Sequence, residues 1–388
     1  MKIAVLRETR AGETRVAASP ETVKKFAALG ASVTVERGAG DAGNFPDHAY
    51  QEAGAAVAAT LGETVSGADL ILKVRAPEAA EFSSYRRGQR IAAIVSPHGN
   101  KPVLEAAAAA GVELFAMDLM PRITRAQSMD VLSSQSNLAG YKAVIDAAAY
   151  YGRAMPMMMT AAGTIAPAKV FIMGAGVAGL QAIATARRMG AVVSATDVRW
   201  AAKEQVESLG ASFVTVDEAA MKDAETAGGY AKEMSDDFKR RQAEFVGKHI
   251  AKQNIVITTA LIPGRPAPQL VAEDMVRAMA PGSVIVDLAV EQGGNVALSR
   301  RGEVIDVGGV IIIGFENVPG RLAQDASNLY ARNLFNFISA FVNKETKAFE
   351  PDWNDDIIKG VALTRDGKIV HPQFAPAPPA DAGQTAAE

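Results

Sequence analysis

The amino-acid sequence predicts an α/β protein made of two doubly wound, Rossmann-like domains with parallel sheets, linked by two long crossing helices. Strand-like and helix-like segments alternate along nearly the whole chain, which is typical of parallel sheets covered by helices. One long helical stretch without strands interrupts this alternation, and a second series of strands follows it. The length of 388 residues is enough for two or three domains, each with its own core.

The first series of predicted strands covers five short apolar segments, residues 2–6, 32–35, 70–74, 91–95 and 114–117. Ser19 and Pro20 indicate the start of a helix, with the serine as cap and the proline at the first helical position. A long helix near 327–342 is expected to return the chain to this domain. We therefore predict a discontinuous first domain, formed by residues 1–132 and 325–371.

A long helix near 133–151 precedes the second series of predicted strands, which covers residues 169–173, 192–195, 213–216, 255–258, 284–286 and 310–313. We assign this series to a second domain, residues 133–324. The segment at about 217–250 is too long for a crossover loop, so it is predicted to be an inserted, mobile loop. Residues 372–388, rich in Pro and Ala, are expected to form a disordered tail.

The composition argues against several classes of function. Forty basic and 43 acidic residues give a net charge of −3, whereas nucleic-acid binding requires clustered positive charge. The chain has no cysteine, and its four histidines have no ligand-like spacing, so we predict no metal site. The apolar stretch at the N-terminus is shorter than a signal peptide requires, and no uninterrupted apolar segment reaches about 20 residues. A cytoplasmic protein without membrane spans is expected.

A glycine-rich turn is the strongest functional signal. Gly174, Gly176 and Gly179 follow the predicted strand 169–173 directly and open an apolar helix. Such glycines allow a tight turn and close approach to a pyrophosphate, which binds at the N-terminus of the helix. The next strand ends at Asp197, where a carboxylate can accept hydrogen bonds from the adenosine ribose. Together these features predict a dinucleotide site.

The carboxylate of Asp197 also bears on which dinucleotide binds. It would repel a 2′-phosphate, so NAD(H) is favoured over NADP(H). Arg199 could instead accommodate that phosphate, although a solvated loop charge is the interpretation that we favour. The corresponding first turn of the first domain, residues 7–12, lacks the glycine pattern and reads as a solvated loop, so we predict one dinucleotide site.

A polar segment lies at the end of the predicted first domain. Arg122, Gln127, Asp130 and Ser133 recur there every three to five positions. This spacing can place several of them on one side of a helix start. From spacing alone, an N-capped helix start that faces solvent is the favoured interpretation.

Five segments, taken together, are far more specific than a glycine motif: residues 122–140, 174–186, 204–210, 227–234 and 258–264. They resemble the NAD(H)-binding component, domain I, of proton-translocating nicotinamide nucleotide transhydrogenases. The resemblance covers nearly the whole chain, which is similar to the separately encoded first portion of the alpha subunit. Alanine dehydrogenases are related to the same family.

The resemblance implies roles for individual residues. The nicotinamide and its ribose would be held by Arg122, Gln127, Asp130 and Ser133. The pyrophosphate and adenosine would contact the glycine turn with Val177, and the run Asp197, Val198 and Arg199. A mobile loop with Gly229 and Tyr230 would close over the nucleotide, and Tyr230 is grouped with the nicotinamide-end residues as catalytic. Further contacts with NAD would come from Gln242 and Leu261.

The resemblance also implies a function in a complex. A hydride would pass directly between NAD(H) on this chain and NADP(H) on a partner subunit, coupled to proton translocation by a membrane-spanning subunit. The chain would form a homodimer on the cytoplasmic side of the inner membrane, attached through its partners. Direct hydride transfer needs alignment of the rings and exclusion of water rather than a general base.

Two alternatives remain open. The chain also resembles alanine dehydrogenase: Arg15 and the segment Lys73-Val74-Arg75 lie where that family binds its amino-acid carboxylate and keeps a lysine, and Arg75 matches the lysine position. However, Glu291 stands where that family has an aspartate, and its acid–base histidine is only loosely matched by His98, which weakens a reaction that must also remove a proton. The second alternative is a non-catalytic NAD sensor, and the intact segment 122–133 is the one feature of the sequence that argues against it.

Overall fold

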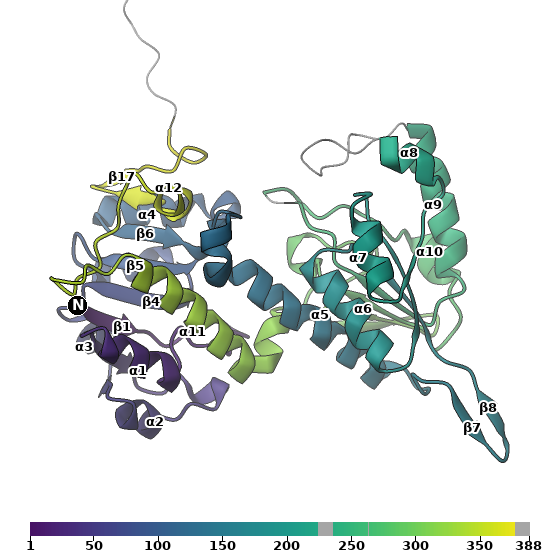
Figure 1. Ribbon diagram of the computed structural model, residues 1–388, viewed down its shortest axis with the longest axis horizontal. Helices are drawn as coiled ribbons and strands as arrows, with labels where there is room; N and C mark the ends of the chain where they lie inside the picture. The colour runs from purple at the N-terminus through teal and green to yellow at the C-terminus, as the bar shows by residue number, and fades with distance from the viewer. Residues whose placement is uncertain (224–235, 263, 377–388) are drawn as a thin grey trace, which may run out of the picture. The chain divides into compact units, whose positions relative to one another are not determined.

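The computed structural model describes residues 1–223, 236–262 and 264–376. The chain forms two compact units: residues 1–134 with the chain from 323 onward, and residues 135–322 (Figure 1). It passes from the first unit to the second within helix α5 (Val131–Tyr150) and returns at the start of helix α11 (Ala323–Ala340). The predicted fold class of two Rossmann-like halves with parallel sheets is confirmed.

The first unit is built on a six-stranded parallel sheet in the order β3-β2-β1-β4-β5-β6. Its strands are β1 (Lys2–Val5), β2 (Ser32–Glu36), β3 (Ala56–Ala58), β4 (Leu70–Arg75), β5 (Arg90–Ile94) and β6 (Glu113–Ala116). Its shorter helices are α1 (Pro20–Ala28), α2 (Asp47–Glu52), α3 (Leu61–Val65), α4 (Lys101–Ala110) and α12 (Asp356–Val361). Its 3₁₀ turns are η1 (Asp41–Gly43), η2 (Ala79–Ser84), η3 (Pro97–Gly99), η4 (Met117–Leu119) and η5 (Thr124–Met129). The strand order reverses between β1 and β4, where such folds bind ligands.

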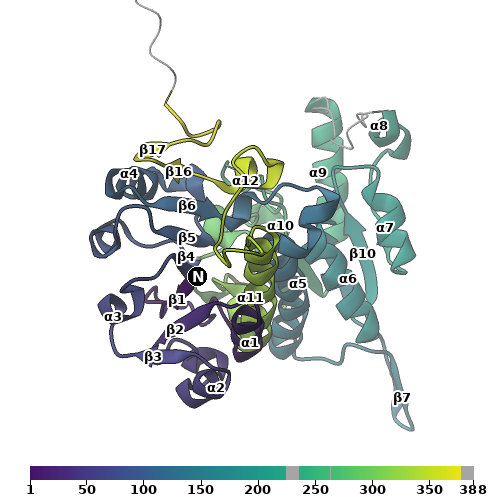
Figure 2. The same ribbon diagram turned by 60° about the vertical axis from the view of Figure 1, so that its left-hand side comes forward.

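Alternate residues of the first sheet pack against different helices. Ile3 and Val5 of β1 belong to a core with α1, α11 and α12, whereas Ala4 and its neighbours on the other face pack with α3 and α4 (Figure 2). The Tyr330 hydroxyl of α11 donates to the Lys73 carbonyl oxygen of β4 at 2.8 Å. The first unit is therefore discontinuous because its core needs a helix from the end of the chain.

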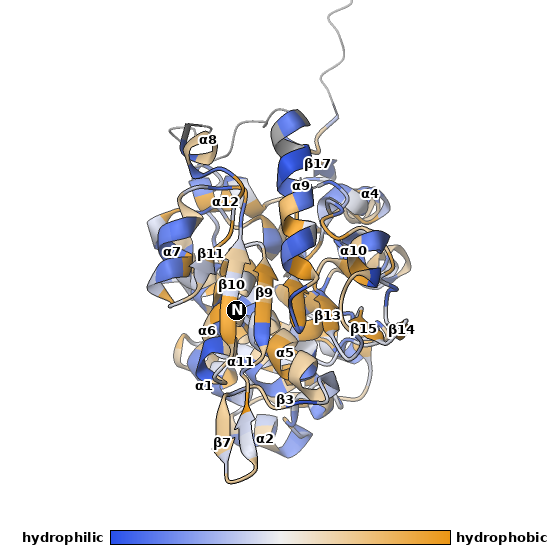
Figure 3. Ribbon diagram, turned by 90° about the vertical axis from the view of Figure 1, so that its right-hand side faces the viewer, coloured by the Kyte–Doolittle hydropathy of each residue, from blue (hydrophilic) through white to orange (hydrophobic). Residues whose placement is uncertain are grey.

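The second unit has a seven-stranded sheet in the order β11-β10-β9-β12-β13-β15-β14. Its strands are β9 (Lys169–Met173), β10 (Val192–Thr196), β11 (Ser212–Phe213), β12 (Ile255–Thr258), β13 (Val284–Asp287), β14 (Val304–Val307) and β15 (Val310–Ile313). Its helices are α6 (Val177–Arg188), α7 (Ala202–Ser208), α8 (Glu218–Asp223), α9 (Asp236–Ile250) and α10 (Glu273–Arg277), and its 3₁₀ turns are η6 (Val290–Gln292) and η7 (Val318–Leu322). The central strands are apolar on both faces, as expected when helices cover both sides (Figure 3).

The sequence analysis did not predict strands β3 and β14, or two short antiparallel hairpins. These hairpins are β7 (Met158–Thr160) with β8 (Gly163–Ile165), and β16 (Thr364–Arg365) with β17 (Lys368–Ile369). β14 pairs antiparallel with β15, and the two are joined by Gly308 and Gly309, which both have positive φ. This is the two-residue turn that suits the twist of a hairpin.

The expected inserted segment at 217–250 contains α8 and α9 where it is described, and Gly229 and Tyr230 lie outside the described residues. Of the expected tail, the described residues 372–376 include Phe374, which packs against the core beneath α4. No helix in the described part of the chain is long and apolar enough to cross a membrane.

Candidate functional site

The glycine-rich turn joins β9 to α6 in the second unit. Gly174 has a φ of +104°, and a Cβ there would lie 2.5 Å from the Thr259 hydroxyl. Gly179 packs even more tightly, since its Cβ would lie 1.8 Å from the Gly174 carbonyl oxygen. A Cβ at Gly176, the residue that precedes α6, would meet no atom within 4 Å. Gly174 and Gly179 thus allow the turn to pack closely against its neighbours. Gly176 leaves open the space in front of the helix N-terminus, where an anion binds favourably.

Asp197 lies at the end of β10, next to this turn. Its side chain is 7% exposed, and it accepts a hydrogen bond from the Ala175 amide at 2.7 Å. The Arg199 guanidinium donates to both carboxylate oxygens, at 2.9 and 3.0 Å, and the Arg199 amide donates at 2.8 Å. Hydrogen bonding to this carboxylate raises the pKa of Arg199 above its ordinary value. The interpretation of Arg199 as a solvated loop charge is therefore replaced by an ion pair with Asp197.

The loop after β12 lies beside the glycine turn, because β12 is the neighbour of β9 in the sheet. Thr259 starts this loop, and its hydroxyl donates to the Gly174 carbonyl oxygen at 3.1 Å. Leu261 follows with 48% of its surface exposed. Exposed apolar side chains among the described residues near this turn are those of Val177, Val198, Leu261 and Ile262. They offer apolar contact to the flat rings of a ligand.

Gln242, which is predicted to contact NAD, makes a structural hydrogen bond within the second unit. Its side-chain oxygen on α9 accepts a hydrogen bond from the Val216 amide at 2.9 Å. This contact attaches α9 to the chain that leaves β11.

The polar segment 122–133 lies in the first unit. Asp130 precedes α5, and its carboxylate accepts hydrogen bonds from the Ser133 amide at 2.9 Å and the Ser133 hydroxyl at 2.5 Å. This is the geometry of a helix N-cap. Arg122 and Gln127 lie in the exposed stretch before it. The structure thus brings Asp130 and Ser133 together, and the predicted N-capped helix start is present.

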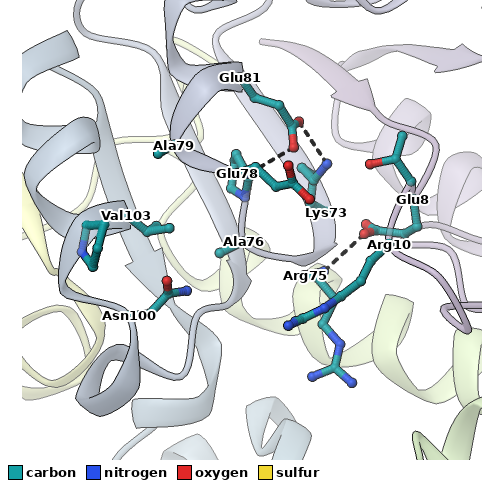
Figure 4. Close-up of a pocket in the computed structure, with 13 residues that line it drawn as sticks. Glu8, Arg10, Lys73, Arg75, Ala76, Glu78, Ala79, Glu81, Asn100 and Val103 are labelled. Carbon is teal, nitrogen blue, oxygen red and sulfur yellow. Dashed lines mark hydrogen bonds and ion pairs between the residues drawn. The ribbon is translucent and has the colours of Figure 1, made fainter.

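A cavity of about 250 Å³ lies at the strand-order reversal of the first unit, at the carboxyl end of β4 (Figure 4). Charged side chains line it: Glu8, Arg10, Lys73, Arg75, Glu78 and Glu81. The Lys73 ammonium pairs with Glu81 at 3.1 Å. The Glu8 carboxylate accepts from the Val74 amide at 2.6 Å, so it does not belong to the solvated loop that the sequence suggested. Burial raises the pKa of Glu8 to about 7.

Another acidic residue, Glu13, pairs with two arginines beside this cavity. The buried Glu13 carboxylate accepts from Arg15 at 2.7 Å and from Arg75 at 2.9 Å. Although burial opposes ionisation, the hydrogen bonds and positive charge of Arg15 hold the pKa of Glu13 at about 2. Sequence reasoning named Arg15 and Arg75 but missed Glu8 and Glu13, because Arg75 meets Glu13 from 62 positions away and only through the sheet.

Two Rossmann-like units, one of them with a glycine turn and an acidic residue at the end of the next strand, define a nicotinamide dinucleotide-binding class of protein. Residues 4–139 and 143–372 match the N-terminal and C-terminal domains of the family alanine dehydrogenase/PNT, and the chain belongs to this family.

The chain is 55% identical over 377 residues to the first portion of the NAD(P) transhydrogenase alpha subunit of Rhodospirillum rubrum, covering 96% of this chain and 98% of that one. Among solved structures, a transhydrogenase from Sinorhizobium meliloti superposes with a TM-score of 0.87 at 54% identity, covering 95% of this chain and all of that one. An L-alanine dehydrogenase superposes with a TM-score of 0.80 at 25% identity, covering 96% and 98%. The resemblance inferred from the sequence is confirmed.

Proposed function

We propose that this chain is the NAD(H)-binding component of a proton-translocating transhydrogenase. It would exchange a hydride directly between NAD(H) on its second unit and NADP(H) on a partner subunit, while a membrane-spanning subunit translocates the proton. When bound, the nicotinamide ring supplies the carbon that donates or accepts the hydride. The observation that carries the proposal is the glycine turn with Asp197, in a chain 55% identical to the first portion of a transhydrogenase alpha subunit.

The residues at the turn fit a dinucleotide. Gly176 leaves open the space before α6, where a pyrophosphate would meet backbone amides, and the adjacent carboxylate of Asp197 suits a ribose. A 2′-phosphate would compete with the Asp197 carboxylate for the Arg199 guanidinium that is paired with it, which supports NAD(H) as the dinucleotide. Val177 and Leu261 would contribute apolar contacts.

Positioning of the nicotinamide is assigned to the first unit and to the inserted segment. Arg122, Gln127, Asp130 and Ser133 would hold the ring and its ribose, as the family resemblance implies. Gly229 and Tyr230 would close over the nucleotide. Their task is to align the ring and exclude water, because transfer between two nicotinamides leaves no substrate proton to remove. The partners and a homodimer on the cytoplasmic side of the membrane are included in the same proposal.

Oxidation of alanine is the alternative function, and the first unit argues against it. Arg15 would have to bind the substrate carboxylate, and Arg75 stands where that family keeps a lysine, but both arginines already donate to Glu13. His98, the loosely matched acid–base residue, is exposed and packs edge-on against the Phe374 ring, with centroids 4.9 Å apart.

The test mixes purified chain and NADH either with pyruvate and ammonium or with an NADP-loaded partner subunit. We expect hydride on the second nicotinamide only when the partner subunit is present. Reductive amination of pyruvate at an ordinary enzymatic rate, roughly 1–10³ per second, would favour alanine dehydrogenase instead. Binding of NADH without transfer in either mixture would support a sensor.

A further inference from the structure

Asn295 is a fully buried residue of the second unit, placed behind the loop that follows β12. Its side-chain amide nitrogen donates to the Ala260 carbonyl at 2.9 Å and to the Pro268 carbonyl at 2.7 Å. Its side-chain oxygen accepts from the Ala260 amide at 3.0 Å. One carboxamide therefore satisfies both backbone polar groups of Ala260 and joins Ala260 to Pro268, as expected of a buried polar side chain.

Asp287 fixes Asn295 in turn. This buried carboxylate lies at the end of β13, and both of its oxygens accept from the backbone amide of Asn295, at 3.2 and 3.0 Å. It also accepts from the Val296 amide and from the Thr258 hydroxyl, each at 3.2 Å. A Cβ at Gly294 would lie 2.7 Å from the carboxylate, so only glycine fits before Asn295. These contacts tie Asn295 to two central strands of the sheet.

The loop that follows β12 is also attached to the glycine turn, through its first residue, Thr259. The Thr259 amide donates to the Met173 carbonyl at 2.9 Å, and the Thr259 hydroxyl donates to Gly174. Ala260 lies between Thr259 and the exposed Leu261. The position of Leu261 relative to the glycine turn is thus set on one side by Thr259 and on the other by Asn295.

We propose that Asn295, held by Asp287, is a positioning residue for the nucleotide. It would touch no portion of the dinucleotide itself. It would keep Ala260 in place and thereby hold Leu261 where the dinucleotide contacts it. This inference rests on the proposed NAD(H) site and adds to it a residue whose influence passes through the loop.

The experiment measures NADH binding by calorimetry, and thermal unfolding, for the full chain and its Asn295→Ala variant. Gln253→Ala is the matched control: Gln253 is also a buried amide, donates to the His249 carbonyl at 3.0 Å, and precedes β12 at the opposite end of that strand. We expect both variants to melt earlier than wild type. Asn295→Ala should weaken NADH binding on the order of tenfold, whereas Gln253→Ala should stay within about twofold.

A double-mutant cycle with Leu261→Ala separates positioning from general destabilisation. In wild type, Leu261→Ala should weaken NADH binding several-fold, and in the Asn295→Ala background it should add almost nothing, because Leu261 is already misplaced. If Asn295→Ala does not fold, Asn295→Ser replaces it, since a hydroxyl cannot reach both carbonyls.

Additive effects of the two substitutions, or an Asn295 variant that binds NADH as tightly as the Gln253→Ala control, would overturn the inference alone. A wild-type chain that does not bind NADH would overturn the proposed function and the inference with it.

Discussion

Gly179→Ala gives a direct test of the glycine turn. In an ordinary helix, replacing glycine by alanine stabilises by about 1 kcal/mol. Here the new Cβ would lie 1.8 Å from the Gly174 carbonyl oxygen and 2.9 Å from its carbon. Both contacts involve backbone, so α6 must shift away from the turn. Overpacking of this kind costs about 1–3 kcal/mol, and we expect the free energy of unfolding to fall by that amount.

Gly176→Ala is the matched control in the same motif. No atom lies within 4 Å of its Cβ position, so its effect on unfolding should stay below about 1 kcal/mol, the usual cost of a poorer N-cap. The added methyl group would instead occupy the space in front of α6, and NADH binding should weaken strongly. Urea unfolding and NADH calorimetry on both variants separate the two effects.

Unfolding of Gly179→Ala at the same urea concentration as wild type would contradict this prediction. Equal destabilisation by Gly176→Ala and Gly179→Ala would also contradict it, because the difference in free space at the two positions would then have no energetic consequence.

Four other substitutions test charged and polar groups. Asp197→Asn should weaken NADH binding by about 0.5–1.5 kcal/mol and narrow its preference over NADPH, and unchanged dissociation constants for both nucleotides would contradict this. The pKa of Glu8 is raised from 4.5 to about 7, so its contribution to stability is present below pH 4.5 and is lost as the pH rises through 7. Between pH 4.5 and 8, the free energy of unfolding of wild type, measured with urea, should therefore fall by up to about 3 kcal/mol more than that of Glu8→Gln. Equal pH dependence of the two proteins would refute the raised pKa of Glu8. Gln127→Asn and Asp130→Asn should slow hydride transfer on the order of 10²-fold in the reconstituted complex while NADH affinity changes little, and full turnover with collapsed affinity would reverse their assignment.

Most of the parallel strands were predictable because they are short, largely apolar segments next to a helix start or a glycine. β3 was missed because Ala56–Ala58 contains alanine, which has little preference for strands, and it forms where the edge of β2 offers pairing. The hairpin β7–β8 was missed because its exposed residues lack the alternation that indicates a half-buried strand.

The site shows the same division between local and distant signals. The glycine turn was predictable because six consecutive residues and the strand before them carry the whole pattern. Asn295 and Ala260 are 35 positions apart in the chain, and nothing near either of them indicates their hydrogen bonds. Glu8 and Val74 are separated by 66 positions and meet because β1 and β4 are neighbours. Local motifs such as the glycine turn can be recognised in the sequence, whereas contacts between distant residues depend on the order of the strands in the sheet.

The ion pair at Asp197 places a condition on the proposed NAD(H) site. A carboxylate has about four acceptor positions, and four protein hydrogen bonds already occupy them, three from Arg199 and one from Ala175. A ribose hydroxyl would therefore have to replace a bond from the Arg199 side chain, which is 39% exposed and can turn toward solvent. Because one hydrogen bond replaces another, the gain at the ribose is small. Most of the affinity must then come from the pyrophosphate at α6 and from the apolar contacts around Leu261, which is why the exact position of that loop matters for binding.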